Sequence, residues 1–185
     1  MHSDESKSSF WTILKGNKLA IAAAILFILV GLAWLFFRNT EPDITPQQFA
    51  QNQFSEIEID LTRNLEDSIA NILKEGELAY LNQQFDVAKK KLSEIPPENP
   101  FYQKAQLYLG YTFIKENDWN KAIDKFENLS IIEDAAYKEE AEWFDLLSTI
   151  MSTPSSNEIL NKINRILSNE NHLFYKEALE LKKLY

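Results

Sequence analysis

Two of the chain's four glycines, Gly76 and Gly110, lie 34 residues apart, and so do Ala88 and Ala122. Glycine inside a helix costs about 1 kcal/mol relative to alanine, so two glycines at this spacing indicate a packing requirement. A period of 34 residues is typical of helix–turn–helix units that stack side by side. The spacing therefore predicts an all-α array of helix pairs.

Each unit should hold its two helices together through small side chains. A small residue at position 8 of the unit and an alanine at position 20 would let the two helix axes approach closely. Larger apolar residues at positions 24 and 27 would fill the space beside them. The first two units supply these larger residues as Leu92 and Ile95, and as Phe126 and Leu129. Equivalent turns, at Gln83–Phe85 and Asn117–Trp119, should precede the second helix of each unit.

A third unit is degenerate. The distance from Ala122 to its counterpart Ile159 is 37 residues instead of 34, and both small positions are now occupied by large residues. Its first helix should contain Trp143, and a turn at Pro154–Ser156 should precede its second helix. A last helix around Ala178 would cover the open end of the array, because such arrays need a cap.

Upstream of the array, Leu19–Phe37 form a run of 19 residues without any charged side chain. As a helix this run would be about 28 Å long, close to the ~30 Å hydrocarbon core of a bilayer. It does not end in a small-x-small cleavage site, so we expect an uncleaved transmembrane helix. Lys7, Lys15 and Lys18 precede the run and only Arg38 follows closely, which predicts a cytoplasmic N-terminus and an array outside the cytoplasm.

These features divide the chain into four predicted parts. They are a cytoplasmic tail at residues 1–18, a transmembrane helix at 19–37, a linker and packing segment at 38–60, and the helical-repeat domain at 61–185. Pro42 and Pro46 are typical of a linker. The apolar residues between Phe49 and Ile59 should pack on the first repeat.

Composition argues against several classes of function. The chain of 185 residues has no Cys and two His, which excludes disulfides and thiolate metal sites and leaves too few histidines for a metal cluster. From Asn39 onward, 15 basic and 26 acidic residues give a net charge of −11, which disfavours nucleic acid as a partner. Isolated glycines and a single histidine outside the tail, His172, support neither a phosphate loop nor a Ser-His-Asp triad. We therefore expect no enzyme, no cofactor, no metal and no small-molecule substrate.

Residues 61–185 resemble a tetratricopeptide-repeat (TPR) domain, through the small and large apolar residues named above. The layout of tail, single span and TPR domain resembles short membrane-anchored TPR proteins of Bacteroidota. In those proteins a Phe-containing segment (here Phe49–Phe54) precedes the repeats, and a Trp-led helix (here Trp143–Phe144) opens the third. The same layout resembles the ancillary TPR subunit of the Sec translocon.

Both resemblances imply a protein-binding role for a domain in the periplasm, anchored in the bacterial inner membrane. The leading interpretation is a scaffold or adaptor that holds another protein at the envelope. The alternative is a chaperone-like accessory subunit of the secretion channel, which would handle unfolded clients.

The resemblance places the binding surface on the concave face, formed by the first helix of each pair. Six residues on this face are candidates for contacting a partner protein or peptide: Leu73, Tyr80, Lys104, Leu107, Tyr111 and Ile114. Such Leu, Tyr and Ile side chains would suit an apolar or amphipathic segment. Alternatively, they pack against the Phe49–Phe54 segment or the next helix, since repeat helices must bury their apolar faces.

Overall fold

The computed structural model describes residues 29–30, 44–58, 61–62, 68–132, 135–154 and 157–185. The chain divides into two compact units, Met1–Asp43 and Ile44–Tyr185. In the first unit only Leu29 and Val30 are described, as helical and exposed residues. The predicted tail and the rest of the predicted span at Leu19–Phe37 lie outside the described residues. None of the described helices is long and apolar enough to cross a membrane.

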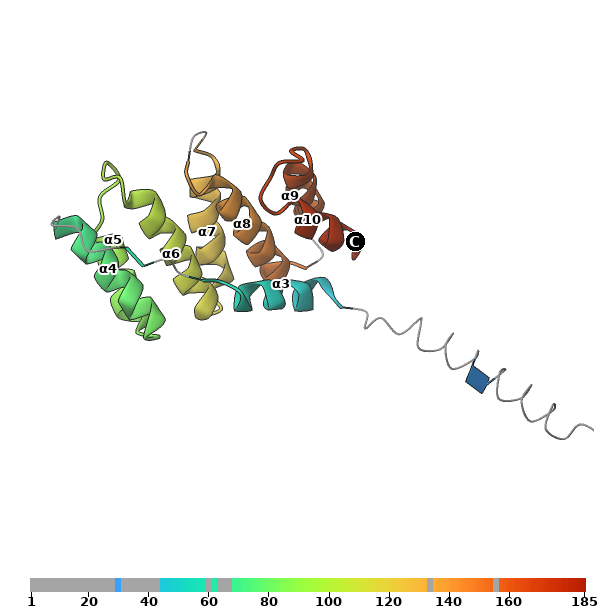
Figure 1. Cartoon of the computed structure of the whole chain (residues 1–185), viewed down its shortest axis with the longest axis horizontal. Coiled ribbons are helices and arrows are strands. Elements are labelled where there is room, and N and C mark those ends of the chain that lie inside the picture. Colours follow the sequence, from blue (N-terminus) through green and yellow to red (C-terminus); the bar gives the residue numbers. More distant parts are fainter. Residues whose placement is uncertain (1–28, 31–43, 59–60, 63–67, 133–134, 155–156) are drawn as a thin grey trace, which may run out of the picture. The chain divides into compact units, whose positions relative to one another are not determined.

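All regular elements described in the second unit are helices, which confirms the all-α prediction. One helix, α3 (Pro46–Ser55), precedes three helix pairs that stand side by side in chain order (Figure 1). The pairs are α4 (Ser68–Leu81) with α5 (Phe85–Ser93), α6 (Tyr102–Lys115) with α7 (Trp119–Ser130), and α8 (Lys138–Ser152) with α9 (Asn157–Leu167). A last helix, α10 (Tyr175–Lys182), packs on α9.

The turns inside the first two pairs have the same geometry. Gln83 and Asn117 have φ angles of 59° and 58°, in the left-handed region. In each turn the next residue donates its backbone N–H back into the preceding helix, from Gln84 to Ala79 O at 2.8 Å and from Asp118 to Phe113 O at 2.9 Å. This arrangement ends a helix without orphaned carbonyls. The 34-residue repeat is therefore present in the backbone as well as in the sequence.

The two repeated glycines allow close packing within the first two pairs. A Cβ atom built on Gly76 would lie 2.8 Å from Leu92 Cδ2, and one on Gly110 would lie 2.5 Å from Phe126 Cζ. The atoms nearest to each added Cβ thus belong to the large residue at position 24 of the unit. Both large residues are fully buried.

A buried ion pair joins the two helices of the third pair. Lys162 on α9 donates to both carboxylate oxygens of Asp145 on α8, at 2.7 and 2.6 Å, and both side chains are buried. Burial raises the pKa of Asp145, although its hydrogen bond with Lys162 acts in the opposite direction. Removing one partner of such a pair strongly destabilises the folded protein, because the other charge is left buried and unpaired.

A second polar contact joins α8 to the turn before α10. His172 Nδ1 accepts the N–H of Phe174 at 3.1 Å, so Nε2 carries the proton and donates to Glu142 Oε2 at 3.2 Å. Burial opposes ionisation of Glu142, but the hydrogen bond from His172 and the charge of Arg165 bring its pKa below the usual value. This histidine therefore orients the last turn of the array.

The start of α3 is determined by local sequence. Thr45 accepts the N–H of Gln48 at 3.2 Å, and the Gln48 side chain accepts the N–H of Thr45 at 2.9 Å. This reciprocal pair is a capping box, and Pro46 at the first helical position fits because it has no N–H to satisfy.

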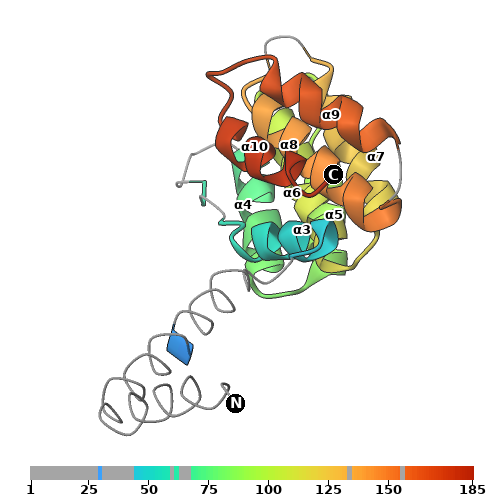
Figure 2. The ribbon, with the colours of Figure 1, turned by 90° about the vertical axis from the view of Figure 1, so that its right-hand side faces the viewer.

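The packing of α3 corrects part of the prediction that the apolar residues between Phe49 and Ile59 pack on the first repeat. Ile57 does lie beside Tyr80 and Phe85 of the first pair, but α3 packs elsewhere. Helix α3 lies next to α8, in the third pair (Figure 1, Figure 2). Phe49 meets the ring of Trp143 edge-on with centroids 6.2 Å apart, while Phe54 stacks on Trp119 at 5.5 Å and on Phe144 at 6.4 Å. Large aromatic rings on α7 and α8 therefore give α3 an apolar surface on which both of its phenylalanine rings pack.

Candidate functional site

The candidate residues come from α4 and α6, the first helices of the first two pairs. Five of the six are buried, with exposed fractions between 0% and 6%. These five are Leu73, Tyr80, Leu107, Tyr111 and Ile114. The chain itself therefore covers most of the surface that the sequence proposes for a partner.

The sixth candidate, Lys104, belongs to a polar cluster on the same face. Its Nζ atom lies 2.9 Å from Glu77 Oε1 and 3.0 Å from Thr62 Oγ1. The fully buried Glu77 also accepts the backbone N–H and the hydroxyl of Thr62, at 2.7 and 2.8 Å. The segment that follows α3 is thereby attached to α4 and α6 through charge-assisted hydrogen bonds, which are the stronger kind.

Tyr111 lies in the aromatic cluster beneath α3. Its ring centroid is 4.9 Å from that of Phe144 in an edge-on contact and 5.8 Å from that of Phe126. Burial raises the pKa of Tyr111 above its usual value. Because Phe54 stacks on the same Phe144 ring, α3 and Tyr111 share one apolar core. This side chain therefore contributes to packing in the described structure.

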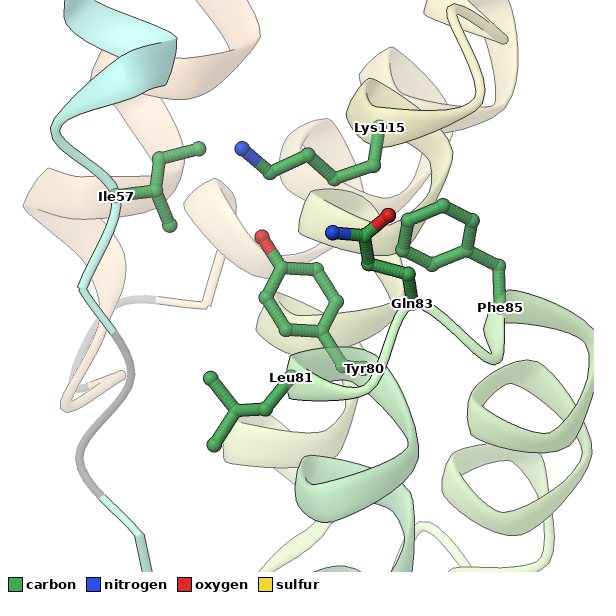
Figure 3. A pocket seen from close by; sticks show the side chains of 6 residues that line it. All are labelled: Ile57, Tyr80, Leu81, Gln83, Phe85 and Lys115. Atoms are coloured by element: carbon green, nitrogen blue, oxygen red, sulfur yellow. The ribbon is translucent and has the colours of Figure 1, made fainter.

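Tyr80 lies at a part of the face that remains open. A pocket of about 390 Å³ lies beside it, where α4 ends and α5 begins. Ile57 lines the pocket from the segment after α3, and Lys115 lines it from the end of α6 (Figure 3). The other lining residues are Leu81, Gln83 and Phe85. Three helices and the segment after α3 thus form one hollow of the size that small ligands occupy, about 300–1,000 Å³.

The hydroxyl group of Tyr80 is unusual because it is buried beside this pocket without a hydrogen bond to any described residue. The residue is 6% exposed, and its hydroxyl is buried without a hydrogen-bond partner in the part of the chain that the structure describes. Burial raises the pKa of Tyr80 to about 12, so the group stays protonated at neutral pH and can donate. A buried donor without a partner costs about 1–3 kcal/mol.

The charges around the pocket favour an anion near this hydroxyl. Figure 3 shows the hydroxyl of Tyr80 and the amino group of Lys115 on the same side of the pocket, near Ile57. Lys115 Nζ makes a long contact of 3.5 Å with the carbonyl oxygen of Phe54. The neighbouring acid, Glu116, accepts from Lys89 at 2.7 Å, which offsets its charge.

Sequence reasoning identified Tyr80 but not the pocket beside it. The repeat register places Leu81 and Lys115 on the concave face, yet nothing in their spacing distinguishes them from other groove positions. Gln83 and Phe85 belong to the turn, and Ile57 reaches the pocket from outside the repeats. The equivalent turns predicted at Gln83–Phe85 and Asn117–Trp119 were the sequence signal that this end of α4 has a fixed shape, and the structure shows the same left-handed residue in both.

In the described parts of the second unit, no cluster of three His, Asp or Glu side chains is arranged to hold a metal ion. Comparison of the chain with protein-family models, with curated proteins and with solved structures finds no match. The function must therefore be argued from the geometry of the concave face.

Proposed function

We propose that this chain is a protein–protein interaction scaffold, anchored to the bacterial inner membrane by the apolar run Leu19–Phe37 and exposing its helical-repeat domain to the periplasm. The observation that carries the proposal is the concave face, which holds α3 through aromatic contacts and still leaves an open pocket beside Tyr80. A face that binds one amphipathic helix of its own chain has the chemistry to bind a segment of another protein. The acidic repeats would favour partners with basic flanks and make association salt-sensitive.

Site-specific photocrosslinking in cells tests the binding role. A benzophenone amino acid at Leu81, which is 48% exposed at the rim of the pocket, should capture one dominant partner protein. The matched control is Leu160 on α9, which is 39% exposed and does not line this pocket. Equal capture at both positions, or none at Leu81, would contradict a scaffold that uses this face. Capture of translocon subunits together with many clients would favour the secretion accessory instead.

The proposed anchoring has its own test. A cysteine placed at the exposed Ser168 should react with a membrane-impermeant thiol reagent once the outer barrier is opened, and a cysteine at Ser3 should not. The reason is the excess of lysine before the apolar run, which is typical of the cytoplasmic side. Reversed labelling would contradict the proposed orientation.

A further inference from the structure

We propose that the pocket beside Tyr80 is a binding site for a carboxylate carried on a short apolar group. This inference depends on the scaffold role in one respect: the carboxylate would belong to a partner chain. Three groups around the pocket can donate hydrogen bonds: the Tyr80 hydroxyl, the Gln83 amide and the Lys115 ammonium (Figure 3). A carboxylate has only acceptor oxygens, so it can satisfy these donors together.

The unpartnered hydroxyl is the observation that points to a ligand. Tyr80 is more than nine-tenths buried, and its hydroxyl lacks a partner within the described residues. Buried polar groups are normally paired, so an acceptor that enters the pocket would restore a hydrogen bond that folding removed. Lys115 adds a positive charge at the same side, which selects an ionised acceptor over a neutral one.

The remaining walls determine what the carboxylate must be attached to. Ile57, Leu81 and Phe85 present apolar surface directly beside the donors. The segment after α3 forms one wall, so an extended peptide could not run along the groove through this point. The ligand must enter from the side and present a carboxylate and an apolar group together. The last residue of a partner chain does this, and so does a protruding glutamate side chain.

Small probes separate these two sources. We would introduce 3-fluorotyrosine at position 80 of the full chain and follow its ¹⁹F signal during titration with three compounds. N-acetyl-leucine mimics a chain end, N-acetyl-leucinamide is its neutral counterpart, and N-acetyl-glutamate α-methylamide carries the carboxylate on a side chain. We expect N-acetyl-leucine to shift the signal at millimolar concentrations and the neutral amide to bind at least fivefold more weakly.

The variant K115M should weaken binding of N-acetyl-leucine at least fivefold and leave the neutral amide unchanged. K176M, which removes an exposed lysine on α10, is the matched control and should change neither affinity. Stronger binding by the glutamate derivative would assign the ligand to a side chain, and weaker binding to a chain end. Equal affinity for acid and amide, or no shift with any compound, would overturn the carboxylate site. Failure of the carboxylate site would not change the result of crosslinking at Leu81. That experiment tests the scaffold role independently.

Discussion

The two ends of the concave face differ in what covers them. Over α8, the helix α3 fills the face with stacked aromatic rings, and Phe54 is buried there. At the end of α4, Ile57 is the residue of the described segment after α3 that forms a wall, and the Tyr80 hydroxyl has no hydrogen-bond partner among the described residues. One repeat geometry therefore yields two regions. In the first, stacked aromatic rings stabilise the fold and leave hollows of about 260 and 280 Å³. In the second, a hollow of about 390 Å³ lies beside a buried hydroxyl that can bind a ligand.

The largest expected effect comes from emptying the filled region. Replacing Phe54 with Ala should lower the free energy of unfolding by about 3–5 kcal/mol, because it removes a buried ring from between Trp119 and Phe144. Urea unfolding of the purified chain, followed by circular dichroism, measures this loss. Asn52→Ala on the exposed side of α3 should stay within about 0.5 kcal/mol of the parent. A similar small loss for both variants would mean that α3 contributes little to stability.

The second prediction concerns the glycine closer to the filled region. Gly110→Ala should cost about 1–3 kcal/mol, because the new Cβ would lie 2.5 Å from Cζ of the buried Phe126 ring. The ring is itself packed against Tyr111 and Phe144, so it has little room to move. Thermal unfolding provides the measurement. Unchanged stability would disprove the close approach of α6 and α7.

The equivalent glycine near the open region should be more tolerant. In Gly76→Ala the new Cβ would lie 2.8 Å from both Cδ2 and Cγ of Leu92. This contact is less severe than the one at Gly110, and an aliphatic side chain can shift more easily than a packed aromatic ring. Exchange of glycine for alanine inside a helix also gains about 1 kcal/mol. We therefore expect a net change within about 1 kcal/mol, measured alongside Gly110→Ala. A larger loss at Gly76 than at Gly110 would reverse the comparison.

These glycines show how much the sequence could predict. Their 34-residue spacing, with Ala88 and Ala122, was enough to locate the first two helix pairs and their turns. The position of α3 could not be predicted, because Phe49 and Trp143 are 94 residues apart and the apolar residues of this segment would suit any apolar face.

The polar interactions within the repeats were also beyond sequence reasoning. Carboxylates on repeat helices are usually solvated, yet Asp145 is buried with Lys162 and Glu77 with Lys104. Burial could not be predicted for the six proposed partner-binding residues either. Five of them, including Tyr80, are buried in the described structure, and Tyr80 is the one of the six that lines the pocket of about 390 Å³.

The smallest effect is expected at the open region itself. Tyr80→Phe should leave stability unchanged at neutral pH or raise it by about 1 kcal/mol, because it removes a buried hydroxyl without a partner. A difference should appear in alkaline solution. The pKa of Tyr80 is raised from 10.0 to about 12, so the unfolded chain loses this proton first and stability falls as the pH rises from 10 towards 12.

The variant lacks this titration and should lose less stability over that range. Unfolding of both proteins in urea at pH 8 and pH 11 measures the difference, with Tyr175→Phe as the control. Parallel losses in parent and Tyr80→Phe would indicate that the hydroxyl is already bonded or solvated.

The contact between α3 and α8 also changes how the domain responds to force. In a repeat array whose units touch only their neighbours, a pull on one end unravels the nearest repeat first. Here the chain before Thr45 leads into α3, and α3 is packed on Trp143 and Phe144 in the third pair. Tension on the N-terminal side would therefore load the third pair before it reached α4. An anchor at that end would hold the domain by its core instead of by its first repeat.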